Sequence, residues 1–194
     1  MTTRRSLQWG AAILAVAGVA WVGLRGLDRL VGGHPEAQQT AGESAAPPAG
    51  VPRITATLFY GSADGEALIP VRREVALADG IVPQAREILA AQLQGAAAPY
   101  LSVIPEGTKL RAFYVTDRGD AFVDLTGEVS SAHPGGSSTE MLTVFAIVNA
   151  VTANLPTIQR VQILVDGQEV DTLAGHVDLR RPLERDESLL REER

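Results

Sequence analysis

The stretch SSTEMLTVFAIVNAVTANLP, residues 137–156, carries the clearest helical signature in the chain. Ser137 followed three residues later by Glu140 is a capping-box pattern, which is typical of a helix N-terminus. Pro156 cannot continue a helix and therefore marks its end. Between these limits the apolar side chains recur at intervals of three and four, which predicts one buried stripe. Its expected members are Met141, Val144, Phe145, Val148 and Val151 or Thr152.

Strand-like segments flank this helix on both sides. After it, Val161–Val165 has the strand period, and Asp166-Gly167 is a hairpin turn signal that leads into Gln168–Leu173. Before it, a second helical pattern ends at Gly95, a residue typical of helix C-termini. The expected order is two strands, a helix, two strands, a helix and two strands. These elements are expected at residues 54–60, 71–77, 82–94, 110–115, 121–125, 137–155, 161–165 and 168–173.

The strand pattern also predicts the architecture. A sheet covered by helices on both faces has strands with continuous apolar runs, whereas these strands alternate between apolar and polar residues. We therefore expect an α/β (α+β) domain with a single mixed sheet of about five to six strands and two helices packed on one face. The apolar face of that sheet is expected to hold Ile54, Leu58, Leu110, Tyr114, Ala121, Val123, Val161 and Ile163.

The chain divides into a folded domain and flanking segments of different composition. Residues 30–52 contain almost no large apolar side chains. Such a segment cannot bury enough surface to offset its ordering entropy, so it is predicted to be a flexible linker. The domain is expected over residues 53–182, followed by a charged tail at 183–194 that frays or forms a short solvated helix.

An apolar run from Trp9 to Leu24 precedes the linker. A membrane-spanning helix needs about 17–25 residues, and the basic Arg4 and Arg5 before the run place the N-terminus in the cytoplasm. We therefore expect a cytoplasmic end at 1–8, a single transmembrane anchor at 9–29 and an extracytoplasmic C-terminal domain. The alternative is a signal peptide cleaved after Ala20, which would give a secreted or periplasmic protein.

Charge and cysteine content exclude several classes of function. Residues 53–182 hold ten basic and fifteen acidic residues, a net charge of −5. Such a domain lacks the electrostatic footprint of a nucleic-acid-binding or anionic-lipid-binding protein. The chain has no cysteine, which excludes disulfides, thiolate metal sites and a lipid-modified cysteine.

The candidate catalytic and metal-binding side chains all have a simpler structural interpretation. Ser137 and Ser138 follow a Pro-Gly-Gly loop that contains His133 as the nearest base, but they are expected to cap the helix. Asp124 lies on the polar face of a strand, where an ion pair with Arg111 is expected. We therefore expect no catalytic residue, no cofactor and no metal. The acidic and histidine side chains considered as metal ligands are Asp124, Glu128, His133, His176 and Asp178.

Two sets of side chains are candidate contacts for a protein partner. The first set lies on the polar face of the expected sheet and would form an apolar patch typical of protein contacts, unless residues 96–106 or the C-terminal segment cover it. Arg72 and Arg73 form the second set. Each either pairs with Glu74, Glu87 or Glu140, or engages an anionic group of a partner. The members of the patch are Phe59, Phe113, Phe122 and Leu164.

Seven short stretches recur in a characteristic order over nearly all of residues 54–178. They are TLFY at 57–60, LIPVRREV at 68–75, LQG at 93–95, IPEGTKL at 104–110, AFVDLTGE at 121–128, AIVNAVT at 146–152 and VQILVDG at 161–167. Together they resemble the GerMN domain family of sporulation and spore germination proteins. The resemblance implies an extracytoplasmic, membrane-tethered, non-catalytic module of a bacterial cell-envelope assembly.

These observations lead to one functional expectation and two alternatives. We expect binding or scaffolding in the cell envelope, through contact with a membrane-complex protein or through self-association, with no role for nucleic acid. One alternative is an enzyme or accessory factor that acts on cell-wall or lipid substrates, which a cleft lined by converging titratable groups would favour. The other is a soluble secreted ligand-binding module, which requires cleavage of the N-terminal segment.

Overall fold

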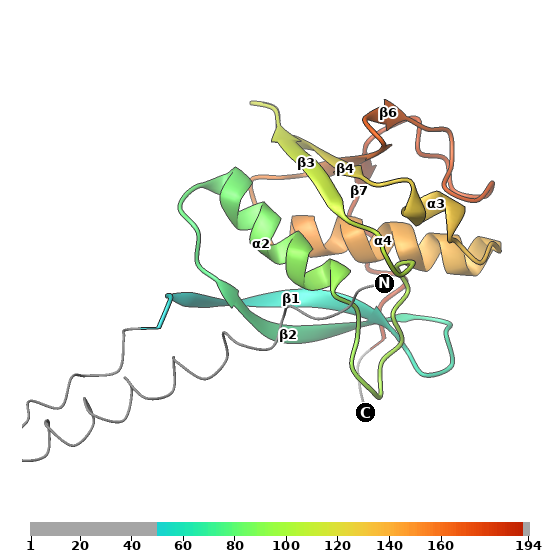
Figure 1. Cartoon of the computed structure of the whole chain (residues 1–194), viewed down its shortest axis with the longest axis horizontal. Coiled ribbons are helices and arrows are strands. Elements are labelled where there is room, and N and C mark those ends of the chain that lie inside the picture. The colour runs from blue at the N-terminus through green and yellow to red at the C-terminus, as the bar shows by residue number, and fades with distance from the viewer. Residues whose placement is uncertain (1–49, 192–194) are drawn as a thin grey trace, which may run out of the picture. The chain divides into compact units, whose positions relative to one another are not determined.

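The computed structural model describes residues 50–191. Two main helices and seven strands are found in this part of the chain, together with one short helical turn (Figure 1). The elements are β1 (Arg53–Gly61), β2 (Leu68–Ala76), α2 (Ile81–Leu93), β3 (Leu110–Val115), β4 (Asp120–Leu125), α3 (Glu128–Ser131), α4 (Ser137–Asn154), β5 (Arg160–Val165), β6 (Gln168–Glu169) and β7 (Leu183–Glu184).

The strands form two sheets, so the expected mixed α+β class is confirmed but the expected single sheet is wrong. β1 and β2 pair only with each other, while the second sheet has the order β3-β4-β5-β6 with β7 also paired to β5. Within it β4 and β5 are parallel, and the other pairs are antiparallel. Figure 1 shows α2 and α4 between the β1–β2 hairpin and the larger sheet. The helices therefore pack between two sheets and not, as expected, on one face of a single sheet.

Side-chain amides explain why β1 does not join the larger sheet. Asn154 at the end of α4 accepts the main-chain N–H of Thr57 at 2.8 Å and donates to its carbonyl at 2.7 Å. Gln92 on α2 forms the equivalent pair of bonds with Phe59. One step further along β1, Gly61 exchanges two main-chain hydrogen bonds with Leu101. The edge of β1 that faces away from β2 is thus occupied without another strand.

Helix α4 is buried on nearly all sides, which corrects the expected single stripe. Met141 is 37% exposed and Phe145 is only half-buried, although both were expected in the stripe. Thr143, Ile147 and Asn149 are fully buried. A helix that lies between two sheets has no solvent face along most of its length, so the amphipathic pattern is weak.

The start of α4 also differs from the expected capping box. Its N-cap residue is Gly136, and no side chain caps it. Ser137 and Ser138 are exposed, and Glu140 points inward. The expected capping role of Ser137 is therefore wrong.

The segment after Pro182 belongs to the fold. Leu183 and Glu184 pair with β5, and Leu68 exchanges main-chain hydrogen bonds with Leu189 and Arg191. The expectation of a frayed or helical tail is wrong for these residues. Among residues 50–191, no helix is both long and apolar enough to span a bilayer. The expected cytoplasmic end 1–8, anchor 9–29 and nearly all of the linker 30–52 lie outside the described residues.

Candidate functional site

An open cleft of about 500 Å³ lies where three segments meet: the end of α2, residues 101–107, and the start of α4. Its volume is within the range of small-ligand sites. Apolar side chains from all three segments line it together with a polar group from each. The lining residues are Gly65, Leu93, Gln94, Gly95, the run 101–107, Pro134, Thr139 and Leu142.

Residues 101–107 form one wall of the cleft, and hydrogen bonds hold this wall in place at Leu101 and at Val103. Leu101 pairs with Gly61 of β1 through hydrogen bonds of 2.8 and 2.9 Å. A Cβ atom added to Gly61 would lie 2.7 Å from Cγ1 of Val103, so only glycine allows this close approach. The carbonyl of Val103 accepts a hydrogen bond from the hydroxyl of Thr143 on α4. The wall is therefore part of the folded core rather than a free loop.

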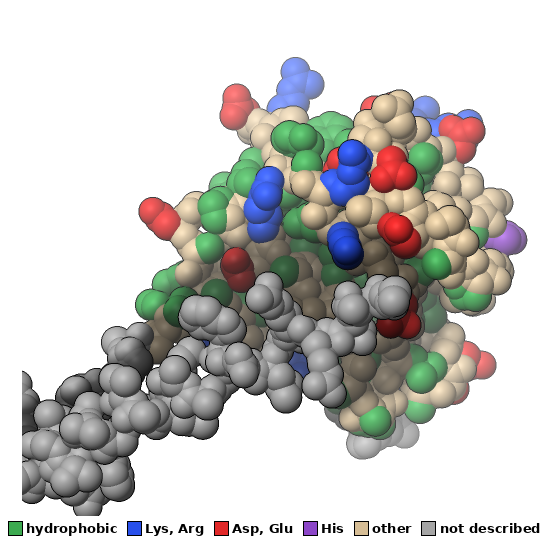
Figure 2. Space-filling model, in the orientation of Figure 1, with side chains coloured by type: hydrophobic (Ala, Val, Ile, Leu, Met, Phe, Trp, Pro, Cys, Tyr) green, Lys and Arg blue, Asp and Glu red, His purple; other side chains and the backbone are tan. Residues whose placement is uncertain are grey.

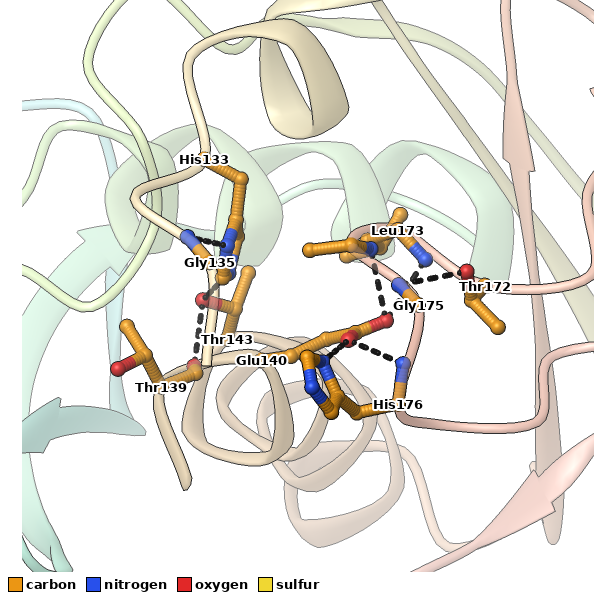
Figure 3. A network of polar contacts seen from close by, with 10 residues as sticks. His133, Gly135, Thr139, Glu140, Thr143, Thr172, Leu173, Gly175 and His176 are labelled. Atoms are coloured by element: carbon orange, nitrogen blue, oxygen red, sulfur yellow. Dashed lines mark hydrogen bonds and ion pairs between the residues drawn. The ribbon is translucent and has the colours of Figure 1, made fainter. Parts of the chain in front are cut away.

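His133 supports this arrangement from the loop before α4 (Figure 3). Its Nδ1 accepts the main-chain N–H of Gly135 at 3.0 Å, so Nε2 carries the proton and donates to the Thr143 hydroxyl at 3.1 Å. Burial lowers the pKa of His133, with a smaller lowering effect from His176 and an opposing effect from Glu140. The neutral ring is thus the form that the surroundings stabilise, and His133 is a structural residue.

Glu140 is fully buried and holds the segment 173–176 against α4 (Figure 3). Its carboxylate accepts the main-chain N–H groups of Leu173, Ala174 and His176 at 2.8–2.9 Å, and Nδ1 of His176 lies 3.2 Å away. Burial alone would raise the pKa of Glu140, but these N–H donors, together with that of Val177, outweigh burial and lower it. Because its acceptor positions are occupied, this carboxylate has a structural role.

The predicted ion pair between Asp124 and Arg111 is confirmed, with Nη1 of Arg111 3.3 Å from Oδ2 of Asp124. Asp124 also accepts the N–H of Gly167 at 2.7 Å, which ties β4 to the β5–β6 turn. Among residues 50–191, no group of three or more acidic or histidine side chains is arranged to hold a metal ion.

The candidate aromatic patch is corrected at two of its four positions. Phe59 and Phe113 are 0% and 2% exposed and belong to the core. The β3–β4 register shifts between Leu110 and Ala112, which reverses the alternation of faces along the rest of β3. Tyr114, expected inside, is instead 58% exposed and lies directly opposite Phe122. Phe122 and Leu164 are half-buried.

Arg72 and Arg73 are both exposed on β2. Arg73 lies over the ring of Tyr60, 5.9 Å from its centroid, and Tyr60 stacks on Tyr100 with the centroids 6.3 Å apart. The expected ion pairs with Glu74, Glu87 or Glu140 are not formed. Figure 2 shows acidic and basic side chains interspersed on the visible face rather than gathered by sign.

Sequence reasoning did not identify the cleft. Residues 96–106, which include most of the cleft wall, were considered only as a segment that could cover the apolar patch. No local sequence pattern predicts that α2, α4 and residues 101–107 come together, because their contact depends on tertiary packing. Glu106, the single ionisable side chain of the lining, has no distinguishing sequence context.

Comparison with protein-family models matches residues 57–171 to the family described as Germane: Sporulation and spore germination. No curated protein matches the chain significantly. Among solved structures, a proposed lipoprotein from Clostridium perfringens is 26% identical with a TM-score of 0.50, and the match covers 68% of this chain and 87% of that chain.

Two further solved structures are from the sporulation protein GerM of Bacillus subtilis. Its tandem GerMN domains match at 13% identity and a TM-score of 0.51, over 70% of this chain and 46% of that chain. Its first GerMN domain matches at 14% identity and a TM-score of 0.50, over 70% and 98%. At these identities the two likenesses show the fold alone.

Proposed function

This chain belongs to the Germane family of sporulation and spore germination domains, and we propose that it is a non-catalytic binding module of the bacterial cell envelope. The apolar run from Trp9 to Leu24 supports a membrane anchor at residues 9–29 with the domain outside the cytoplasm. The similarity to a proposed lipoprotein of Clostridium perfringens is consistent with an envelope location.

The cleft between α2, α4 and residues 101–107 is the observation that carries the proposal. Three polar side chains in its lining have no hydrogen-bond or ion-pair partner among residues 50–191. They are the amide of Gln94, the hydroxyl of Thr139 and the carboxylate of Glu106. Acid–base or nucleophilic chemistry needs at least two cooperating groups. Glu106 is the single ionisable side chain in the lining, which favours binding over turnover.

We propose a protein as the partner, either a component of a membrane complex or a second copy of this chain. Arg72 and Arg73 are exposed and free of ion pairs within the described domain, which supports a contact with an anionic group. Phe122 and Leu164 remain candidates for a second contact surface on the outer face of the larger sheet, with Tyr114 beside Phe122.

Photo-crosslinking in cells tests this proposal with the full chain. A photoreactive amino acid is placed at Leu101 in the cleft wall, at Arg72 on β2, and, as the control, at Arg118 in the β3–β4 turn outside both surfaces. We expect one dominant envelope protein, or the chain itself, to be captured from Leu101 or Arg72 and not from Arg118. Equal capture from all three positions, or none from any, would contradict the proposal.

The intact mass of the native protein tests the anchor separately. A retained N-terminal segment supports the anchored form, whereas a mass that lacks the first 20 residues would show cleavage after Ala20 and a released protein.

A further inference from the structure

We infer that the cleft receives a basic side chain of a partner peptide, a lysine or an arginine, with Glu106 as its counter-ion. The inference rests on the proposed function, since it specifies what the binding module takes into its cleft. It concerns the chemistry of the occupant, which neither the family nor the similar structures name.

The charge of the lining selects against anions. Glu106 is the single charged side chain among the lining residues, and no lysine or arginine lines the cleft. Glu106 is exposed and has no partner within the described domain, so its carboxylate can receive a cation without first breaking an existing bond. A carboxylate binds a guanidinium or an ammonium through charge-assisted hydrogen bonds, which are stronger than neutral ones. A phosphate or carboxylate in the same place would meet repulsion and find no counter-ion.

The hydrogen-bonding groups of the rim match a cation as well. A lysine ammonium has three donors and no acceptor, so a site for it must supply acceptors. Gln94, Thr139 and Glu106 each present an oxygen without a partner in the described domain. Ser102 is different, because its hydroxyl already accepts the N–H of Ala96 at 2.8 Å. The lining therefore offers acceptor oxygens from all three segments that form the cleft.

The cleft floor fits the apolar stem of such a side chain. Leu142 and Ile104 are 3% and 9% exposed, and Leu93 and Val103 are half-buried beside them in the lining. Lysine and arginine lay their methylene groups on apolar surface while the charged end stays in a polar place. Leu101, 45% exposed at the same cleft, adds apolar surface for a neighbouring residue of the partner.

The size and shape of the cleft favour a peptide segment over a single small cation. A volume of about 500 Å³ is larger than one side chain requires. Seven consecutive residues, 101–107, line the cleft, so one wall is a continuous stretch of main chain beside which a peptide could lie. An extended peptide with apolar residues on either side of the basic residue fits this lining.

Nuclear magnetic resonance titration of the full chain tests the inference with defined probes. The peptides are acetyl-Leu-Lys-Leu-amide and its arginine, norleucine and glutamate counterparts. We expect the lysine or arginine peptide to shift the amide signals of residues 101–104, Glu106, Gly107 and Thr139. It should bind at least fivefold more tightly than the norleucine and glutamate peptides. Binding should weaken at higher salt because the attraction is electrostatic.

Two variants separate the role of Glu106 from a general charge effect. E106Q should weaken binding of the basic peptide at least fivefold, whereas E87Q, which removes an exposed carboxylate on α2 outside the cleft, should leave it unchanged. Equal binding of the lysine and glutamate peptides, unchanged binding by E106Q, or shifts confined to other surfaces would overturn the inference. If Leu101 crosslinks a partner in cells while the basic peptides fail to bind, the inference is wrong and the proposed function stands; if both experiments fail, both are wrong.

Discussion

The side-chain amide of Gln92 on α2 forms two hydrogen bonds with the main chain of Phe59 on β1: its Oε1 accepts the N–H at 2.9 Å and its Nε2 donates to the carbonyl at 2.7 Å. This is the pattern that a neighbouring strand would provide. Both residues are at most 1% exposed, so no water can replace these bonds. The amide therefore joins the helix layer to the hairpin and closes the edge of β1.

Replacement of Gln92 by leucine should destabilise the domain by about 3 kcal/mol, because it leaves a buried N–H and a buried carbonyl without partners. Urea denaturation of the full chain, followed by circular dichroism, measures the change. The matched control is Q94L, two residues further along, where the side chain is exposed and makes no such bonds. We expect this control to change stability by less than about 0.5 kcal/mol; equal effects of the two variants would contradict the assigned role of Gln92.

The sequence was sufficient to predict both main helices, the segments of β1 to β6 and the family, but not β7, which lies in the expected charged tail. Helical and strand periodicities are local, and the seven family stretches keep their order. The arrangement of the strands into two sheets was not predictable in this way. It depends on Gln92 and Asn154, two polar residues on helices whose amides replace a strand. A hydrophobicity pattern cannot show that a side-chain amide will take the place of a neighbouring strand.

The candidate site was less predictable than the fold, for two physical reasons. A register irregularity near Arg111 reverses the faces of β3, so Phe113 and Tyr114 exchange the positions that strict alternation assigns to them. The cleft, in turn, arises where Leu93, Ile104 and Leu142 meet from three separate segments. No local sequence pattern predicts either the register irregularity or the cleft.

The reversed faces of β3 predict opposite sensitivities for two adjacent residues. F113A should destabilise the domain by about 3–4 kcal/mol, because Phe113 is 2% exposed and its truncation leaves a cavity. Y114A should cost less than about 1 kcal/mol, since Tyr114 is 58% exposed. Chemical denaturation of both variants measures the difference. A larger loss of stability for Y114A than for F113A would support regular alternation of faces along β3 and would contradict the observed register.

The buried carboxylate of Glu140 predicts a loss of stability in acid. The surroundings lower its pKa in the folded state, so the unfolded state binds a proton more readily. Its stabilising contribution is complete above the ordinary glutamate pKa and is lost as the pH falls through the lowered folded value. E140Q should therefore be clearly less stable than the natural chain at pH 7, and the two should converge towards pH 3. Denaturation series across this range measure the effect, with E87Q as the exposed control; a constant difference at all pH values would contradict the linkage.

The lowered pKa of His133 predicts that its ring titrates below the ordinary range of histidine. Burial stabilises the neutral ring, which accepts from Gly135 and donates to Thr143. The contribution of this ring to stability is complete above the ordinary histidine pKa and is lost as the pH falls below it. Nuclear magnetic resonance of the histidine Cε1–H signals should show His133 titrating below a histidine in an unstructured peptide. A midpoint at or above that reference would be inconsistent with this environment.

The close approach of Gly61 to the cleft wall predicts that one methyl group disturbs both the fold and the cleft. In G61A the added Cβ would lie 2.7 Å from Cγ1 of Val103 and 3.2 Å from Cβ of Leu101, so residues 101–103 must shift. Overpacking of this kind costs about 1–3 kcal/mol. Hydrogen exchange should speed up at the N–H of Leu101, which donates to the carbonyl of Gly61. G50A is the matched control, because a Cβ there meets nothing within 4 Å. If G61A matched G50A in stability and exchange, the wall of the cleft would not depend on its contact with β1.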